Sequence, residues 1–291
     1  MQNYEEERGF IPALPSVETM PDLTPYAENG FSFAAFDGDT MLGFLCSVSP
    51  FKNVFGSTDV TGVFSPMGAN GAAGNNRAAI YARLYQAAGE KWVRAGASSH
   101  AICLYAHDKA AQEQFFRYGF GMRCVDAIRF MDNIEAPPCD GYTFDELTEE
   151  DFIEVYPLDT LLNKGYAESP FFMYRESDDE TAFLKNAVCN RSIYHIAWYR
   201  RQAVAFIRAE LDGETFIKNT PGYLHCKGLY CMPEHRGKGI GQNLLHILIQ
   251  RLKKQGYTRL GVDFESINPA AYGFWLKHFT AYTHSVVRRI D

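Results

Sequence analysis

Residues 236–241 constrain this chain more than any other segment. Glycine occupies every second position there, and the segment separates a strand-like pattern from a helical one. The segment from Leu224 to Met232 predicts a strand, and Pro233 ends it because proline has no N–H to donate to a strand ladder. From Gln242 onward, leucines at spacings of one, three and four predict an amphipathic helix. We therefore expect a strand, a glycine-rich loop and a helix in direct succession.

Such a loop is typical of a phosphate site. The first N–H groups of a helix have no partners and carry a partial positive charge, and glycines let the backbone approach an anion closely. Arg236 and Lys238 add two cations. A Walker A loop is absent, and the third glycine comes two residues after the second, which does not fit a dinucleotide fingerprint. A pyrophosphate is the expected ligand.

Composition excludes several other classes of protein. The formal net charge is −7, which speaks against a general nucleic-acid binder. No apolar run approaches the ~20 residues of a membrane span, and the acidic N-terminus does not resemble a secretory signal. The seven cysteines form no C-x-x-C pair, so a disulfide framework and a metal site are not expected. We expect a cytoplasmic protein without a membrane or nucleic-acid partner.

The two halves of the chain show a similar order of predicted elements. In the first half, residues 32–64 predict strands, 77–95 a helix, 100–106 a strand, 109–118 a helix and 123–131 a strand. Residues 1–30 show no helical period and read as an irregular arm. Pro137-Pro138 marks a linker, after which residues 142–290 repeat the order with two additional helices at 148–163 and 177–189. This repetition suggests an internal duplication.

The run Arg236-Gly237-Lys238-Gly239-Ile240-Gly241 has the form R-x-x-G-x-G and resembles the acyl-CoA-binding motif of the GNAT superfamily, the GCN5-related N-acetyltransferases. The resemblance implies an α/β (α+β) fold class: two tandem GNAT folds, each a mixed, mostly antiparallel central sheet flanked by helices. We expect a degenerate GNAT-like domain in residues 1–136, which lacks the R-x-x-G-x-G motif, and an acetyltransferase domain in residues 137–291.

The resemblance also implies where coenzyme A binds. Asn268, Ala271 and Phe274 match the second motif of the family, N-x-x-A-x-x-F/L-Y, in the predicted helix after the strand at 259–264. In the family, the central strand and this next strand separate, and the pantetheine fills the gap. The residues implied to contact acetyl-CoA, a co-substrate, are Cys231, Met232, Arg236, Gly237, Lys238, Gly239, Ile240, Gly241, Asn268, Phe274 and Trp275.

The catalytic residues are harder to assign, because the family's acidic Tyr is replaced here by Trp275, and an indole N–H is not a useful acid. Tyr272 lies three residues earlier on roughly the same helix face and is the substitute candidate for protonating the leaving thiolate. Glu265 and His225 are candidate bases. By the period of two in a strand, His225 is expected on the same face as Cys231.

The predicted reaction is acetyl transfer from acetyl-CoA to an amine, by direct attack in a ternary complex in the C-terminal domain. One alternative is a coenzyme-A-binding regulatory or scaffold protein without transfer activity, which the Trp at position 275 favours. Another is aminoacyl transfer from a charged tRNA, against which the acidic balance speaks. The sequence specifies neither the acceptor, whether a small molecule or a peptide, nor the oligomeric state.

Overall fold

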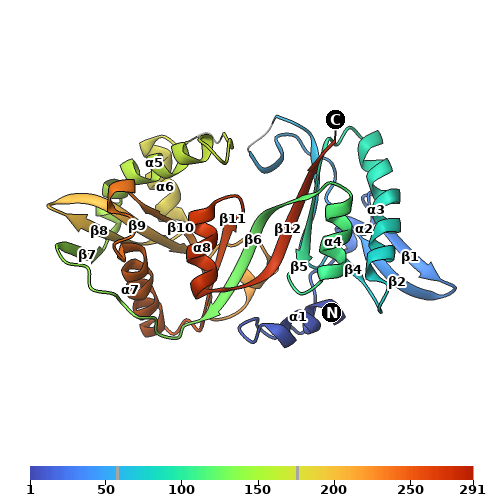
Figure 1. Ribbon diagram of the computed structural model, residues 1–291, viewed down its shortest axis with the longest axis horizontal. Helices are drawn as coiled ribbons and strands as arrows, with labels where there is room; N and C mark the ends of the chain where they lie inside the picture. The colour runs from blue at the N-terminus through green and yellow to red at the C-terminus, as the bar shows by residue number, and fades with distance from the viewer. Residues whose placement is uncertain (57–58, 175–176, 291) are drawn as a thin grey trace. The chain divides into compact units, whose positions relative to one another are not determined.

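The computed structural model describes residues 1–56, 59–174 and 177–290 (Figure 1). The chain divides into two compact units, Met1–Ala127 with Phe264–Asp291, and Ile128–Asp263. These limits differ from the expected boundary at residues 136 and 137, because the last helix and strand associate with the N-terminal part of the chain. The division of the chain at residues 136 and 137 into two copies of one fold stays a prediction.

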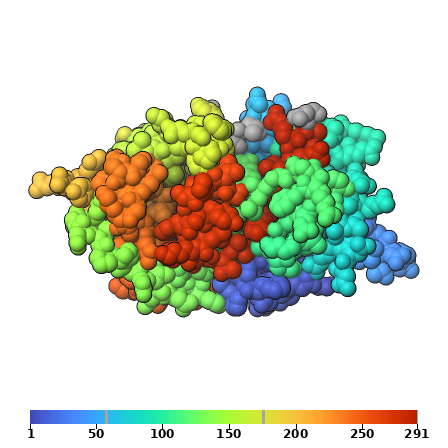
Figure 2. All heavy atoms as spheres, in the orientation of Figure 1, coloured from blue at the N-terminus to red at the C-terminus, as the bar shows by residue number. Residues whose placement is uncertain are grey.

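The first unit contains the N-terminal and C-terminal elements. Its helices are α1 (Gln2–Phe10), α2 (Thr24–Ala27), α3 (Arg77–Arg94), α4 (Lys109–Arg117) and α8 (Pro269–His278), with a short 3-10 turn at Val54–Gly56. Its strands are β1 (Phe33–Asp37), β2 (Thr40–Leu45), β3 (Gly62–Ser65), β4 (Asn70–Ala72), β5 (Ser99–Tyr105), β6 (Gly121–Phe130) and β12 (Thr280–Arg289). Helices α4, in green, and α8, in red, both lie on the face seen in Figure 2.

Strand pairing in the first unit is mixed. The order β1-β2-β4 forms one antiparallel sheet, and β3-β5-β12-β6 follow one another in a second. Strand β3 is parallel to β5, whereas β12 is antiparallel to β5, with Thr283 opposite Tyr105. Helices α3 and α4 cover one face of this sheet, and their apolar side chains form a core that includes Trp92, Phe115 and Val286.

The second unit contains the strands β7 (Tyr142–Glu146), β8 (Ile193–Tyr199), β9 (Gln202–Glu210), β10 (Tyr223–Cys231) and β11 (Arg259–Glu265). Its helices are α5 (Tyr156–Ala167), α6 (Glu180–Cys189) and α7 (Ile240–Lys254), with 3-10 segments at Glu149–Val155, Phe216–Asn219 and Pro233–His235. The strand order is β11-β10-β9-β8-β7, with only β10 and β11 parallel. The expected mixed, mostly antiparallel sheets flanked by helices are confirmed.

Local chemistry explains most of the helix limits. Asp108 and Asp179 cap α4 and α6, because their side chains accept hydrogen bonds from Ala111 N (3.0 Å) and Ala182 N (2.8 Å). The helix expected at 148–163 is instead a 3-10 segment followed by α5, with a proline in the first turn of α5. A proline suits this position because the first N–H groups of a helix have no intrahelical acceptor.

The expectation for residues 1–30 is wrong. This segment is not an irregular arm, because α1 and α2 lie within it. The error has a physical reason: helix α1 has a low intrinsic apolar periodicity, but Tyr4 and Glu7 are buried against the first unit. Tertiary contacts therefore stabilise a helix that its own sequence pattern does not indicate. Within the described residues, no helix has the length and apolar character needed to cross a bilayer.

Candidate functional site: a strand fork and an uncapped helix

The loop between β10 and α7 presents unpaired backbone donors. Gly237 and Gly239 have φ of 75° and 79°, in the left-handed region that glycine enters without strain. Gly239 is the N-cap of α7, and because glycine has no side chain, no side-chain hydrogen bond caps this helix start. Within the part of the chain that the structure describes, the N–H groups of residues 237–242 meet no protein acceptor. The loop and helix start therefore form a ready anion site.

The cations of the loop lie next to these donors. Arg236 and Lys238 are both exposed, and neither forms an ion pair among the described residues. The Arg236 Nε donates a hydrogen bond to the carbonyl oxygen of Cys231 (2.9 Å), and its guanidinium lies 5.8 Å from the centre of the Tyr230 ring. Arg236 thus links the loop to the end of β10 and keeps a positive charge there.

A buried histidine fixes the position of the loop. His235 is almost fully buried, and its Nδ1 lies 2.8 Å from the Tyr142 hydroxyl. The Tyr199 ring lies 5.3 Å from the imidazole, and the His235 N–H bonds to the Met232 carbonyl (2.9 Å). The sequence reasoning did not single out His235, since an imidazole in a loop gives no sign of its partners on β7 and β8.

The predicted linker at Pro137-Pro138, which lies within the second unit, also contacts the loop. A Cβ added at Gly239 would lie 2.7 Å from Cγ of Pro137, and the Pro137 carbonyl accepts a hydrogen bond from Asn243 Nδ2 (2.9 Å). Gly239 therefore has two requirements, a positive φ and close approach of another chain segment. Any side chain at this position displaces the linker.

The strands beside the loop separate. Parallel pairing joins Tyr223–Cys226 of β10 to Arg259–Val262 of β11, whereas β10 continues to Cys231. The expected separation of the two strands is thus confirmed. On its other side β10 stays paired with β9 as far as Cys231, opposite Ala205. The last part of β10 therefore borders a fork on the side of β11.

A β-bulge lies at the point where the fork opens. The register of β10 against β9 shifts between Cys226 and Gly228, so Lys227 is an extra residue in β10. His225 pairs with Glu210, and Cys231 pairs with Ala205. Directly opposed residues share a face, and residues 205 and 210 of β9 lie on different faces. The expectation that His225 and Cys231 share a face is therefore wrong, because the bulge inverts the alternation.

His225 is fully buried and joins two neighbours. Its Nε2 lies 2.7 Å from Asp263 Oδ1 on β11, and its Nδ1 lies 2.6 Å from the Tyr223 hydroxyl. Because a carboxylate accepts, Nε2–H donates to Asp263 and Nδ1 accepts from Tyr223. A side chain with no exposed surface cannot contact an acceptor amine, so His225 can only act through Asp263.

Asp263 was missed by the sequence reasoning. Its side chain is 27% exposed and stands on β11 directly after the last pair of the parallel ladder, at the mouth of the fork. Gly261 makes room for this arrangement, since a Cβ there would lie 1.8 Å from the Tyr223 hydroxyl oxygen. A signal was present in the sequence, because an aspartate interrupts the apolar run from Leu260 to Phe264.

Further charged groups line the same region of the second unit. Lys227 lies 3.6 Å from Asp212 and 3.7 Å from Glu214. Burial disfavours the charged form of Lys227, but the carboxylates of Asp263, Glu214 and Asp212 outweigh it and raise the pKa of Lys227. Lys227 therefore stays protonated at neutral pH beside these carboxylates.

The cysteine at the end of β10 is not an activated nucleophile. Cys231 is half-buried, and burial raises the pKa of its thiol to about 11. Its Sγ lies 3.6 Å from the Met232 carbonyl oxygen, and the Met232 N–H bonds to Val204 on β9 (2.9 Å). At neutral pH the sulfur stays a thiol, so nothing at this position favours a covalent acyl-cysteine.

Comparison with known proteins agrees with this geometry. Residues 156–279 match the profile of the "Acetyltransferase (GNAT) family". This part of the chain is a domain of the GNAT superfamily. Membership supports an acyltransferase activity. The match extends from α5 to the end of α8 and includes the strand fork and the glycine-rich loop.

One solved GNAT structure shares the fold, and two others are similar to a lower degree. A GCN5-related N-acetyltransferase from Sphaerobacter thermophilus superimposes with a TM-score of 0.56 at 12% identity, over 87% of this chain and 78% of that chain. A tandem GNAT protein from the clavulanic acid biosynthesis pathway gives 0.49 at 14% identity, over 89% and 82%. A GCN5-related N-acetyltransferase from Kribbella flavida gives 0.48 at 11% identity, over 90% and 91%. A comparison with curated protein sequences found no match.

The residues of the second GNAT motif lie in the first unit. Asn268 is the N-cap of α8 and accepts a hydrogen bond from Ala271 N (3.0 Å). Trp275 is buried, with the Phe274 ring 4.9 Å away, so it serves as a core residue of this helix. Their part in binding coenzyme A stays a prediction.

The remaining catalytic candidates also lie in the first unit. Tyr272 is half-buried, and its ring meets Phe264 edge to face at 6.0 Å. Glu265 is buried, and its Oε2 lies 3.4 Å from Arg123 Nε. The ion pair with Arg123 already occupies this carboxylate, which makes Glu265 a weaker candidate base than Asp263.

The first unit has a helix start that corresponds to that of α7. Helix α3 begins at Arg77 without a side-chain cap and connects the parallel strands β3 and β5, as α7 connects β10 and β11. Helix α1 lies at this place. Asn3 donates to the Ala72 carbonyl (3.2 Å), and Glu6 pairs with Arg77.

A buried carboxylate completes this contact. Glu7 has no exposed surface, and its Oε2 accepts a hydrogen bond from the His107 backbone N–H (3.0 Å) and contacts His107 Nδ1. Glu6 and Glu7 therefore place two negative charges at the position in the first unit that corresponds to the anion site of the second.

Proposed function

We propose that this GNAT protein is an N-acetyltransferase that moves an acetyl group from acetyl-CoA to the amine of an acceptor, with the second unit active. The observation that carries the proposal is the uncapped start of α7, where the N–H groups of residues 237–242 lack protein acceptors beside Arg236 and Lys238. A pyrophosphate suits this place, because its oxygens accept N–H bonds and its charge suits a helix N-terminus.

The fork between β10 and β11 is the proposed place for the pantetheine arm. A chain of amide groups needs backbone partners, and the part of β10 from Gly228 to Cys231 extends beyond its pairing with β11. This arrangement orients the thioester toward the mouth of the fork, where Asp263 is partly exposed. Binding along a rigid strand would hold the carbonyl carbon in position for attack.

The proposed chemistry is a direct transfer. The neutral amine nitrogen attacks the thioester carbonyl carbon, the tetrahedral intermediate collapses, the C–S bond breaks, and the coenzyme leaves as a thiolate that takes up a proton. A protonated Cys231 thiol speaks against an acyl-enzyme, since the thiolate is the nucleophilic form. A backbone N–H near Cys231 is the candidate donor to the oxyanion.

Asp263 is the proposed base. An amine reaches the site as an ammonium ion at neutral pH, so a group at the mouth of the fork must accept its proton before attack. Asp263 has the required exposure, and His225 holds its Oδ1 in place at 2.7 Å. We assign His225 a positioning role through Asp263. Tyr272 stays the candidate acid for the thiolate.

One coenzyme per chain is the proposed stoichiometry. The carboxylates of Glu6 and Glu7 stand beside Arg77 and His107, where the first unit would otherwise offer its own anion site. A diphosphate there would have to displace helix α1, which Tyr4 and Glu7 anchor, and face two negative charges. The first unit is thus proposed as a partner of the active unit with no coenzyme of its own.

Titration calorimetry with acetyl-CoA, followed by an assay for free thiol in the presence of amines, tests the function. Saturable binding with amine-dependent release of coenzyme A supports an acetyltransferase. Tight binding without release for any amine in a broad panel supports the alternative, a regulatory or scaffold protein, which the buried Trp275 favours. Absence of binding at millimolar ligand contradicts both.

A further inference from the structure

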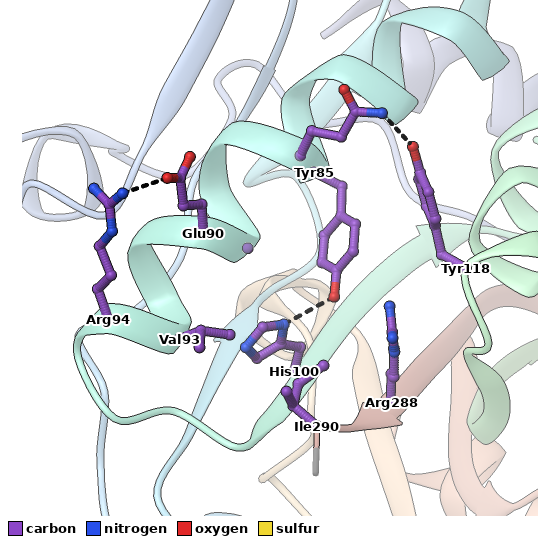
Figure 3. Close-up of a pocket in the computed structure, with 10 residues that line it drawn as sticks. Tyr85, Glu90, Val93, Arg94, His100, Tyr118, Arg288 and Ile290 are labelled. Atoms are coloured by element: carbon purple, nitrogen blue, oxygen red, sulfur yellow. Dashed lines mark hydrogen bonds and ion pairs between the residues drawn. The ribbon is translucent and has the colours of Figure 1, made fainter.

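A pocket of about 500 Å³ lies in the first unit, between α3, β5, the end of α4 and β12 (Figure 3). Small-molecule sites commonly have ~300–1,000 Å³. Tyr85, Val93, His100, Tyr118, Arg288 and Ile290 contribute to its lining. None of these residues takes part in the proposed acetyl transfer, so the pocket needs an explanation of its own.

The base of the pocket combines a neutral imidazole with a cation. In the antiparallel pair of β5 and β12, His100 stands directly opposite Arg288, so both side chains lie on the same face of the sheet. The His100 Nδ1 lies 2.9 Å from the Tyr85 hydroxyl, and its Nε2 lies 3.3 Å from the Ala97 carbonyl oxygen. Since a carbonyl only accepts, Nε2 carries the proton and Nδ1 accepts from Tyr85.

His100 is therefore neutral and does not balance the charge of Arg288. Burial lowers the pKa of His100 to about 4, and the Arg288 charge acts in the same direction. The one acid in the lining, Glu90, is paired with Arg94. Among the residues that the structure describes, no carboxylate forms an ion pair with Arg288. The pocket has one guanidinium whose charge the protein does not balance.

The walls of the pocket are aromatic and apolar. The rings of Tyr85 and Tyr118 lie 5.4 Å apart at 44°, and the Tyr118 hydroxyl accepts a hydrogen bond from Gln86 Nε2 (2.9 Å). Val93 adds an exposed apolar side chain on the same helix. A ring or another flat apolar body fits such walls, because aromatic faces pack well against each other.

A glycine keeps one wall open. Gly89 stands within α3, where glycine is less favourable than alanine by roughly 0.8–1.0 kcal/mol. A Cβ at this position would lie 3.3 Å from the Tyr85 ring. The helix accepts an unfavourable residue at the position where a side chain would crowd the aromatic wall.

We propose that this pocket binds a small aromatic monocarboxylate, with the carboxylate on Arg288 and the ring between the tyrosines and Val93. A guanidinium binds a carboxylate through two parallel N–H···O bonds, and a single cation balances a single negative charge. A phosphate dianion fits less well, since one cation would leave it half balanced among apolar groups. The site would give the first unit a ligand of its own, independent of acetyl-CoA.

The test uses the full chain with benzoate as the probe and benzamide as its uncharged counterpart. A ligand of this size in a single pocket is expected to bind with a Kd on the order of 0.1–1 mM. Calorimetry measures the affinity, and the fluorescence of Trp92 gives a local signal, since its ring lies 5.1 Å from His100 and 6.1 Å from Tyr85. Benzamide is expected to bind at least about tenfold more weakly.

Variants separate the pocket from other anion sites. Arg288→Ala is expected to weaken benzoate at least about tenfold, whereas Arg289→Ala, its exposed neighbour in β12, leaves the affinity unchanged. Val93→Trp should block the pocket from its rim without altering the core. Measurement in saturating acetyl-CoA keeps the proposed coenzyme site occupied throughout.

Three results overturn the proposal. The first is no benzoate binding at about 10 mM, a concentration that exceeds the expected Kd tenfold or more. The others are equal affinity for benzamide and a benzoate affinity that Arg288→Ala does not change. Circular dichroism checks that each variant is folded. Should Arg288→Ala fail to fold, Val93→Trp decides, because loss of benzoate binding in that variant supports the pocket and unchanged binding refutes it.

Discussion

Asp263 Oδ1 lies 2.7 Å from Nε2 of the fully buried His225, and the pair joins β11 to β10 at the point where the two strands separate. The carboxylate is partly exposed and the imidazole is not. An exposed group supported by a buried donor is typical of a general base whose orientation is fixed from behind. This relationship leads to the first two predictions.

Asp263→Asn is expected to lower kcat by a factor of ~10²–10⁴, the range of a general base, with little change in the affinity for acetyl-CoA. The amide keeps the shape of the side chain and cannot take a proton from an amine. Steady-state kinetics and calorimetry measure the two effects. Asp212→Asn, which changes another carboxylate of the same region that pairs with Lys218 and Lys227, is the matched control. A kcat equal to that of the unmodified protein would clear Asp263 of this role.

His225→Gln and His225→Leu test the positioning role. Glutamine places an N–H donor where Nε2–H stands, whereas leucine removes the donor. We expect Leu to reduce kcat and to move the acidic limb of the pH–rate profile to higher pH, because the carboxylate loses a hydrogen bond that favours its charged form. His225→Gln should retain most of the kcat and leave the acidic limb of the pH–rate profile close to that of the unmodified protein. If the two variants behave alike and the profile does not move, His225 only fills space.

Gly237→Asp is expected to weaken acetyl-CoA binding by at least about tenfold, since it adds a negative charge next to the helix N-terminus. A Cβ at Gly237 meets nothing within 4 Å, so the effect is electrostatic rather than steric. Gly74→Asp is the matched control: its φ is 69°, and its surroundings are equally open, but it lies in the first unit. An equal loss of acetyl-CoA affinity in both variants would mean that backbone strain at positive φ, and not the added charge, causes the loss.

The double change Arg236→Ala with Gly239→Asp is expected to abolish binding of acetyl-CoA. It removes the cation that contacts Cys231 and puts a carboxylate where Pro137 approaches within 2.7 Å of an added Cβ. Thermal unfolding of the variant shows whether the linker contact is also lost. Unchanged affinity in a folded variant would remove the loop from the coenzyme site.

One acetyl-CoA per chain is the expected stoichiometry, because α1 occupies the corresponding place in the first unit. Calorimetry with the full chain gives the number directly. Comparison with Gly237→Asp assigns the site, since a second site in the first unit would survive that change. Two sites in the unmodified protein would overturn our interpretation of α1.

The contact between α1 and His107 predicts a dependence of stability on pH. Burial opposes the charged form of His107, but the hydrogen bond and charge of Glu7 outweigh it and raise the pKa of His107. A histidine with a raised pKa stabilises the fold fully below its unfolded pKa of about 6.5, and this contribution is lost as pH rises through the folded pKa. The Tm difference between the unmodified protein and His107→Ala should therefore be larger at pH 6 than at pH 9.

Glu7→Gln provides the control for this prediction. Without the carboxylate, His107 loses the partner that raises its pKa, so the difference between pH 6 and pH 9 should shrink. Differential scanning calorimetry measures all three proteins. A pH dependence that persists unchanged in Glu7→Gln would assign it to other groups.

The sequence by itself determined the local features of this protein. The limits of α3, expected at 77–95 and found at Arg77–Arg94, follow from apolar spacing. The glycine loop and the start of α7 follow from residues 233–241 alone, because a proline stop, positive-φ glycines and a leucine stripe act over a few residues. The same local signals indicated the family, which the profile match bears out.

Tertiary structure decided what depends on distant neighbours. A single extra residue, Lys227, moved His225 to the face opposite Cys231, because strand alternation inverts at a bulge that no local pattern marked. Asp263 acquired its place at the fork through a pairing 38 residues apart in the chain. Helix α1 forms because Glu7 and Tyr4 are buried by contacts with distant residues, and β12 joins the first unit by pairing with β5. Side-chain burial and strand pairing of this kind depend on residues far apart in the chain. The periodicity of a segment indicates which of its faces can be buried, but it does not identify the element against which that face packs.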